Sequence, residues 1–194
     1  GDWSSVSGGS GNVANGENSW CGGGYQNIAS GHYSATGGGE QNEAKNDASW
    51  VGGGYRNKAE GSHSSVVGGW TNNASGDYAS VSGGRTNKST GIYASVSGGW
   101  DNQATAHTAS VSGGWKNEAN GQNGSVLGGK SNTVTHESAA IVGGLSNEAI
   151  SNYAVVVGGE SNMASADNSV VSGGQTREAL DAHDWVAGSL GEDL

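Results

Sequence analysis

The side chains that could form a catalytic triad are all present, but the sequence does not bring them together. The 194-residue chain contains serines throughout, 18 acidic residues and five histidines. The histidines keep no fixed spacing from any carboxylate; they are His32, His63, His107, His136 and His183. Nucleophilic or acid–base catalysis needs a base held against an oriented partner. We therefore expect isolated surface histidines, no catalytic residues and no enzyme activity.

Metal, cofactor and nucleic-acid sites are not favoured either. Cys21 is the only cysteine, and it takes a place that valine fills elsewhere, so we expect a buried thiol that fills the core. No Asp recurs at one interval, as a Gly-Gly-x-Gly-x-Asp calcium repeat would require. The net charge of −10 disfavours nucleic acid as a partner. We expect neither metal nor cofactor.

Aromatic side chains, in contrast, recur at multiples of fifteen residues. One such row holds the candidate binding residues Tyr25, Tyr55, Trp70, Trp100 and Trp115. Rings at one place in successive repeats would stack on each other and stabilise the fold. An exposed row of rings would instead bind sugars or another surface. Both interpretations stay open at this point.

The same interval of fifteen residues organises the whole chain. One unit runs from Ala79 to Tyr93, and the consensus is Ala/Ser-Ser-Val-Ser-Gly-Gly-x-x-Asn-x-Ala-x-Gly-x-Tyr, whose positions we number 1 to 15. The asparagine at position 9 recurs without slippage from Asn12 to Asn162. A fixed period of this kind indicates a repeat protein. With 38 glycines and only 32% hydrophobic residues, the chain cannot fill an ordinary globular core, so we expect one elongated domain.

The array divides into two parts. Residues 1–179 form twelve repeats, and residues 180–194 form a degenerate last half-repeat with a C-terminal cap. We expect Trp185 and Leu190 to cover the last rung, and the acidic tail to repel further stacking. Because Trp3 already falls at position 15, we also expect the sequence to be a piece of a longer protein. No run of about eighteen apolar residues occurs, so no membrane span is expected.

The pattern predicts an all-β parallel β-roll, or β-solenoid, with two short strands in each coil. Side chains alternate between the two faces of a strand. Positions 1, 3, 5, 9, 11 and 13 are regular and should point inward, whereas positions 10, 12 and 14 vary and should face water. Asparagine at position 9 should form a ladder between coils. Glycine at positions 5, 6 and 13 should supply turns that need positive φ.

Positions 1 to 6 carry no charge before Asp184, although positions 2 and 4 lie on the outer face of their strand. A strand without charge on either face is typical of one that is buried on both faces. We therefore expect this sheet to pack against further copies of the chain, most simply as a homotrimer. The candidate interface residues are Ala140, Val142, Val155, Val157 and Val170.

From Ser4 to Ala179 the string Ser-Val-x-x-Gly-x-x-Asn-x-Ala-x-Gly resembles the head repeat of trimeric autotransporter adhesins of the YadA type. The family's usual unit is Ser-Val-Ala-Ile-Gly-x-x-Ser-x-Ala-x-Gly, and the present repeat adds one residue between positions 13 and 1. The resemblance implies a left-handed β-roll, a trimer at a cell surface or outside the cell, and adhesion to host matrix protein, glycan or another cell. A phage or extracellular fibre built of similar repeats is equally open.

Two other functions remain open on the sequence alone. The core Val-Ser-Gly-Gly-x-x-Asn-x-Ala is similar to the repeats of grass ice-binding β-rolls. Ice binding needs a flat face with one Thr-like row, but at position 8 the threonines Thr71, Thr86 and Thr176 are interrupted by other residues. A purely structural fibre shaft is the second alternative.

Overall fold

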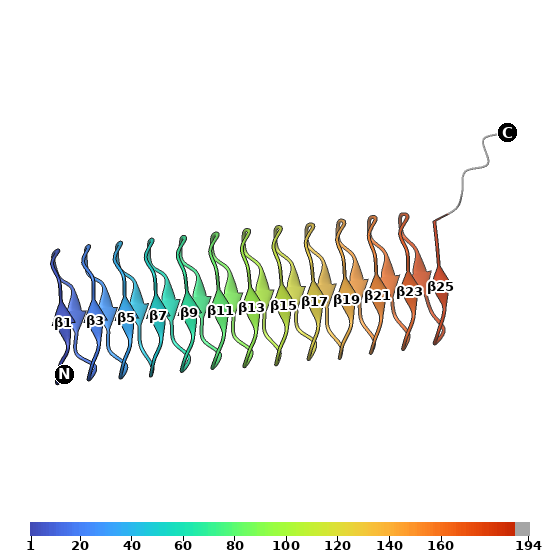
Figure 1. Cartoon of the computed structure of the whole chain (residues 1–194). Helices are drawn as coiled ribbons and strands as arrows, with labels where there is room; N and C mark the ends of the chain where they lie inside the picture. The colour runs from blue at the N-terminus through green and yellow to red at the C-terminus, as the bar shows by residue number, and fades with distance from the viewer. Residues whose placement is uncertain (189–194) are drawn as a thin grey trace.

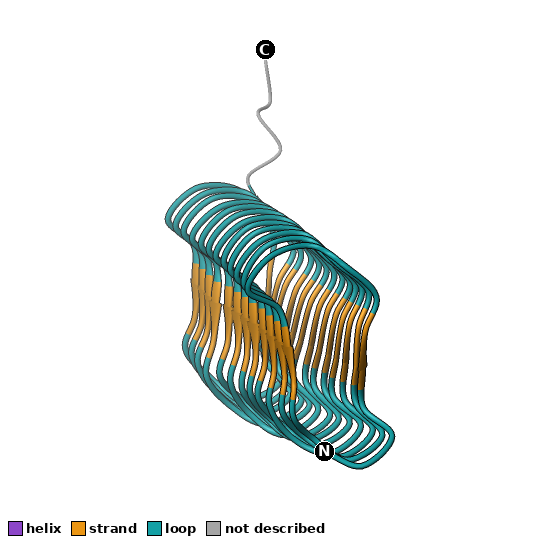
Figure 2. Cartoon of the chain, turned by 90° about the vertical axis from the view of Figure 1, so that its left-hand side faces the viewer, coloured by secondary structure: helices purple, strands orange, loops and turns teal. Residues whose placement is uncertain are grey.

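The computed structural model describes residues 1–188 as a straight rod of stacked fifteen-residue coils (Figure 1). Its strands are two residues long and form two parallel sheets, one with 13 strands and one with 12. Seen along the rod, the two sheets face each other and loops close the coil at both ends (Figure 2). The predicted all-β solenoid with two short strands per coil is confirmed. Residues 1–188 contain no helix with the length and apolar character needed to cross a membrane.

The odd-numbered strands form the first sheet, hereafter the odd sheet. Their bounds are β1 Ser5–Val6, β3 Trp20–Cys21, β5 Ala35–Thr36, β7 Trp50–Val51, β9 Ser65–Val66, β11 Ser80–Val81, β13 Ser95–Val96, β15 Ser110–Val111, β17 Ser125–Val126, β19 Ala140–Ile141, β21 Val155–Val156, β23 Val170–Val171 and β25 Trp185–Val186. Each strand contributes positions 2 and 3 of the repeat. Neighbouring strands pair fifteen residues apart, for example Val81 with Val96.

The even-numbered strands form the second sheet, hereafter the even sheet. Their bounds are β2 Val13–Ala14, β4 Ile28–Ala29, β6 Glu43–Ala44, β8 Lys58–Ala59, β10 Asn73–Ala74, β12 Lys88–Ser89, β14 Gln103–Ala104, β16 Glu118–Ala119, β18 Thr133–Val134, β20 Glu148–Ala149, β22 Met163–Ala164 and β24 Glu178–Ala179. Each strand contributes positions 10 and 11. The register is again fifteen residues, as in Lys88 with Gln103.

The core is one side chain thick and continuous along the rod. Between the first and the last described coil, valines at position 3 and alanines at position 11 are buried, as are the small residues at position 1. Val81 and Ala104 are both 0% exposed, and Cys21 is buried among them as expected. Asn87, at position 9, is also fully buried. The structure therefore confirms that the side chains at positions 1, 3, 9 and 11 point inward, as the sequence predicted.

The asparagine ladder joins coils through the backbone. Asn87 Nδ2 donates to the carbonyl oxygen of Gly83 in its own coil at 2.8 Å and to that of Gly99 in the next coil at 3.0 Å. Asn87 Oδ1 accepts a hydrogen bond from the backbone N–H of Asn102 at 2.9 Å. The buried amide thus satisfies the Gly83 carbonyl and the Asn102 N–H, and it adds a second bond to the Gly99 carbonyl, which also accepts from the Arg85 N–H.

The turns differ from the expectation at four positions of the repeat. Positive φ occurs at position 6, as predicted, with Gly84 at 82°. It also occurs at positions 8 and 15, which carry larger side chains such as Thr86 at 54° and Tyr93 at 58°. Position 13 has no positive φ, and Gly91 is needed there because a Cβ would collide with the carbonyl oxygen of Ala106. Gly83, at position 5, also lacks positive φ, and a Cβ there would meet open space.

The last described coil continues the ladder. Strand β25 pairs with β23 in the regular register, and Trp185 stands opposite Val170. Trp185 is 70% exposed, and its indole Nε1 donates to Ser172 Oγ on the preceding coil. The expectation that Trp185 covers the last rung is wrong, because position 2 faces outward and places the ring on the outer face of the odd sheet. Leu190 and the acidic tail lie outside the described residues.

Candidate interaction surfaces

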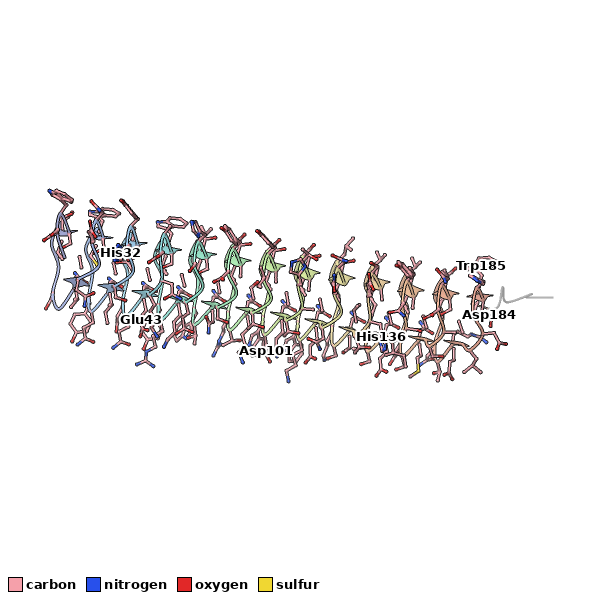
Figure 3. The ribbon with its side chains drawn as sticks, turned by 90° about the horizontal axis from the view of Figure 1, so that it is seen from below. His32, Glu43, Asp101, His136, Asp184 and Trp185 are labelled. Carbon is pink, nitrogen blue, oxygen red and sulfur yellow. The ribbon has the colours of Figure 1, made fainter. Side chains whose placement is uncertain are left out.

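The potential catalytic and metal-binding side chains are spread along the rod. His32, Glu43, Asp101 and His136 lie in different coils (Figure 3). His32 Nδ1 lies 3.5 Å from Glu17 Oε2, on an exposed surface. Within residues 1–188, no three His, Cys, Asp or Glu side chains are grouped so that they could hold a metal ion. The absence of catalytic activity stays a prediction.

The five predicted aromatic binding residues lie in one row at position 7, where consecutive coils are joined by parallel β-bridges. Trp70 is 52% exposed and Trp100 is 47% exposed. Tyr25 is also exposed, whereas Tyr55 and Trp115 are half-buried. The structure therefore places all five on one edge of the roll.

Neighbouring side chains cover the ring faces in the middle of this row. The rings of Trp100 and Trp115 stack at 5.2 Å between centroids, with planes 10° apart. Arg85 lies between Trp70 and Trp100, with its guanidinium carbon 5.6 and 5.5 Å from the two ring centroids. Lys130 Nζ lies 4.2 Å from the centroid of Trp115. Cation–π and ring–ring contacts thus use the faces of Trp100 and Trp115 and turn the ring edges toward solvent.

The ends of the row differ from its middle. Tyr55 and Trp70 form a tilted pair at 4.9 Å. Tyr25 has Ser10 and Glu40 as its bridge neighbours, so no ring stands beside it in the adjacent coils. A flat ligand would therefore meet an open ring face at Tyr25 more readily than at the tryptophan pair.

The predicted interface residues share the outer face of the odd sheet, hereafter the odd-sheet face, which is formed by positions 2 and 4. Val142 and Val157 are each 45% exposed, and Ala140, Val155 and Val170 are half-buried. No residue at these two positions is charged in any of the 13 strands of the sheet. Toward the N-terminus, the rings of Trp20 and Trp50 lie so close over Gly22 and Gly52 that a Cβ on either glycine would meet them. The odd-sheet face is therefore uncharged, and these two rings lie against it instead of projecting from it.

Sequence reasoning missed a groove on the other side of the roll, hereafter the N-terminal groove. It runs between the rows of positions 8 and 10 and has a volume of about 570 Å³. It is lined by Gly11, Val13, Gln26, Ile28, Gln41, Glu43, Arg56, Lys58 and Thr71. Positions 8 and 10 vary from coil to coil, so only the neighbouring glutamines and basic residues could have marked this stretch.

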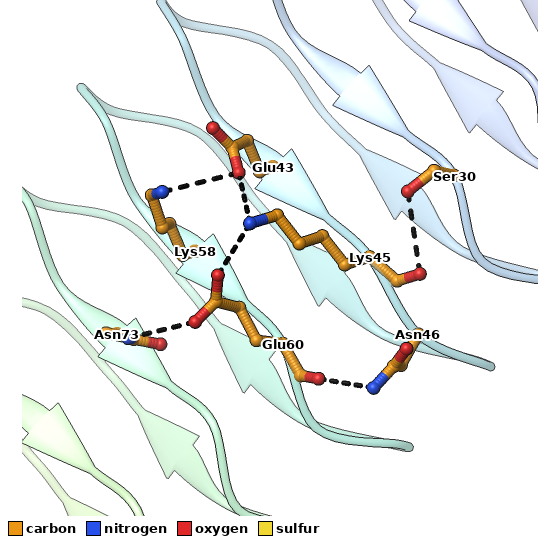
Figure 4. A network of polar contacts seen from close by, with 7 residues as sticks. All are labelled: Ser30, Glu43, Lys45, Asn46, Lys58, Glu60 and Asn73. Carbon is orange, nitrogen blue, oxygen red and sulfur yellow. Dashed lines mark hydrogen bonds and ion pairs between the residues drawn. The ribbon is translucent and has the colours of Figure 1, made fainter.

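An ion network lies beside the groove (Figure 4). Lys45 Nζ lies 2.8 Å from Glu43 Oε2 and 2.7 Å from Glu60 Oε1, and Lys58 Nζ lies 3.4 Å from Glu43 Oε2. Hydrogen bonding to Glu43 and Glu60 raises the pKa of Lys45 above its ordinary value. The hydrogen bond from Lys45 lowers the pKa of Glu60, and a further bond from Asn73 acts in the same direction. The carboxylate of Glu43 is shared by two ammonium groups.

The comparison with known proteins adds no relative, since no protein-family model and no curated protein matches this chain.

Proposed function

We propose that this chain is a non-catalytic head or fibre domain, at a cell surface or outside the cell, that assembles with copies of itself and mediates attachment. The observation that carries the proposal is the odd-sheet face, which stays free of charge over 13 strands. The even sheet, in contrast, carries a lysine or glutamate at position 10 in six of its 12 strands and at position 12 in Lys45 and Glu60. A face that only met water would not be expected to exclude charge so consistently.

The thin core supports self-association. A coil buries one valine or similar residue at position 3 and small residues at positions 1 and 11. Burial of a half-exposed valine such as Val142 or Val157 against another copy would contribute about 1 kcal/mol. Because the apolar side chains recur in β19, β21 and β23, several such contributions would add along one interface. A face-to-face dimer and a threefold arrangement would each bury this face in every copy. We favour the threefold arrangement because it agrees with the resemblance to trimeric adhesin heads.

Attachment is the function that such an assembly would serve best. With the odd-sheet face covered, the variable positions 7, 8, 10, 12 and 14 would remain on the outside and present different chemistry in each coil. The partners we propose are host matrix protein, glycan or another cell surface. A structural fibre shaft would share the assembly but have no such partner.

Ice binding is retained as a second candidate because of one feature of the odd-sheet face. In β11, β13 and β15, positions 2 and 4 are all serine: Ser80, Ser82, Ser95, Ser97, Ser110 and Ser112. These hydroxyls form two rows on the odd-sheet face, one at position 2 and one at position 4, in register from coil to coil. Such a surface could order water only if it were exposed, so ice binding and self-association through this face exclude each other.

Two measurements on the purified chain test the proposal. Adhesion to immobilised matrix protein, glycan and whole cells should be detectable, and it should be lost when the odd-sheet face is prevented from assembling. Thermal hysteresis or shaped ice crystals at micromolar protein would overturn the adhesive function in favour of ice binding. A stable assembly that adheres to none of these surfaces would leave only the structural shaft.

A further inference from the structure

We infer that the N-terminal groove binds an acidic polysaccharide, with about one sugar residue for each coil. This inference names a ligand for the proposed attachment function and rests on it for its biological role. The groove spans five successive coils, from Gly11 through Gln26, Gln41 and Arg56 to Thr71 at position 8. Its volume of about 570 Å³ lies within the range of small-ligand sites.

One wall of the groove is a line of hydrogen-bonding groups. Gln41 Nε2 donates to Gln26 Oε1 at 3.0 Å, and Arg56 Nε donates to Gln41 Oε1 at 2.6 Å. These bonds hold three long side chains of position 8 in one direction along the rod. The guanidinium carbon of Arg56 lies 4.9 Å from the centroid of the Tyr55 ring, and its two Nη groups make no hydrogen bond or ion pair within residues 1–188. They remain available to a ligand carboxylate or sulfate, which a guanidinium binds in a bidentate manner.

The opposite wall, at position 10, changes from apolar to charged along the groove. Val13 and Ile28 come first, and Glu43 and Lys58 follow. Glu43 is already paired with Lys45 at 2.8 Å and with Lys58 at 3.4 Å. The lining therefore holds two cations, Arg56 and Lys58, and one carboxylate, Glu43, so it is net positive. The adjacent Lys45 and Glu60 balance each other. The chain as a whole has a net charge of −10. An anionic group would be directed to this end of the groove.

Sugar chemistry fits both walls. The apolar C–H face of a pyranose can lie on Ile28 and Val13, hydroxyl groups can bond to the amides of Gln26 and Gln41, and an acidic substituent can reach Arg56. The coils repeat every ~4.8 Å, which gives about 19 Å from the first row to the fifth. This repeat is close to the length of one residue in an extended pyranose chain. An extended acidic peptide advances about 3.3 Å per residue and would fall out of register with the coils.

The test uses substitutions that other coils already carry at the same positions. Arg56→Gln with Lys58→Gln removes both cations, because glutamine stands at position 8 in Gln41 and at position 10 in Gln103. The matched control, Lys88→Gln with Lys116→Gln, removes two cations from the same two rows outside the groove. A third variant, Ile28→Glu, places a carboxylate in the apolar part, as Glu43 does one coil later.

Calorimetric titration with a tetramer of uronic acid should show binding to the full chain and to the control. Affinity should fall about tenfold in the Arg56→Gln, Lys58→Gln variant, in line with lost charged hydrogen bonds. Ile28→Glu should also weaken binding, and a neutral tetramer of glucose should bind less well than the acid. Equal affinity in control and groove variant, or no binding of the uronate at all, would overturn the inference. Tighter binding of an oligoglutamate peptide would overturn the assignment to a sugar.

Failure of this inference and failure of the proposed function can be distinguished. If the chain adheres to surfaces but binds no uronate, the groove is not the attachment site and the proposed function stands. If the chain binds uronate through Arg56 and Lys58 but adheres to no surface, the inference about the groove is supported and the proposed attachment function is wrong.

Discussion

The two outer faces of the roll are built by the same rule and differ in chemistry. Both belong to stacked strands of two residues, and in both one residue points inward and one outward. On the even sheet the outward positions mix neutral side chains with lysine and glutamate, some of which form ion pairs, as Lys45 and Glu60 do at 2.7 Å. On the odd sheet they hold serine, alanine, glycine, valine, leucine and tryptophan without one charge. Under the proposed function, water covers the even sheet and further copies of the chain cover the odd sheet.

The largest effect, dissociation of the assembly, should follow from placing charge on the odd-sheet face. Val155→Lys with Val157→Asp flanks the buried Val156 without altering it, and an interface that buries both charges could not solvate them. We expect the assembly to dissociate, as measured by light scattering. The matched control is Thr133→Lys with Thr135→Asp, at positions 10 and 12 of the even sheet, where Lys58 and Glu60 already occur. Dissociation of the control and not of the Val155, Val157 variant would reverse the assignment of the two faces.

The next largest effect, a loss of folding stability, is expected from a change in the core between the two sheets. Asn102→Ala removes an amide that donates to Gly98 and Gly114 at 2.8 and 3.0 Å and accepts from the Asn117 N–H at 3.0 Å. We expect a loss of about 3 kcal/mol in the free energy of unfolding, because buried backbone groups lose their partners. Chemical denaturation would measure it. A loss no larger than that of an exposed substitution would mean that water replaces the amide and that the ladder is not structural.

A smaller effect is expected at the edge between the faces. Trp100→Ser with Trp115→Ser removes a stacked pair whose centroids are 5.2 Å apart. We expect a loss of about 0.5–1.5 kcal/mol in unfolding free energy with the assembly retained. Because the ring faces are covered by Arg85 and Lys130, adhesion to glycan-coated surfaces should survive. Abolished adhesion in a folded assembly would assign these rings to binding.

The smallest loss of folding stability is expected from a change in the ion network on the even sheet. Lys45→Gln should cost about 0.5 kcal/mol near neutral pH, because the pairs are partly exposed and screened. The lowered pKa of Glu60 means that its stabilisation is present above its ordinary value of 4.5 and is lost as the pH falls through the lower, folded-state pKa. The raised pKa of Lys45 means that its stabilisation is present below 10.5 and is lost as the pH rises through the higher, folded-state pKa.

Thermal unfolding of the wild type and of Lys45→Gln at several pH values would test this window. The two melting temperatures should differ at neutral pH and converge in acid, once Glu60 is protonated. A constant difference down to the lowest pH would show that Lys45 acts through packing and not through its charge.

How far the sequence predicted the structure depends on whether a feature repeats. The period, the two strands, the inward valine and alanine and the asparagine ladder recur in nearly every coil, so one pattern revealed them. The positive φ at Thr86 and Tyr93 was missed because those residue types seldom adopt it. The role of Gly91 was misassigned because its reason is contact with the next coil, which no single repeat contains.

The sequence predicted one interaction surface and missed another, again depending on whether the residues of that surface repeat. The odd-sheet face was found from an absence of charge that holds in every coil. The N-terminal groove was missed because Gln26, Gln41 and Arg56 are different residues at a variable position, and only their mutual hydrogen bonds join them. The covering of Trp100 by Arg85 likewise depends on side-chain placement and not on spacing.

The oligomeric mass of the purified chain in solution, measured by light scattering, tests the central claim most directly. One chain has a mass of 19.2 kDa. Burial of the odd-sheet face by further copies predicts a stable multiple of this mass, three chains in the proposed trimer, that persists on dilution. A particle of 19.2 kDa at all concentrations would contradict the account, because the uncharged face would then meet water like the charged one.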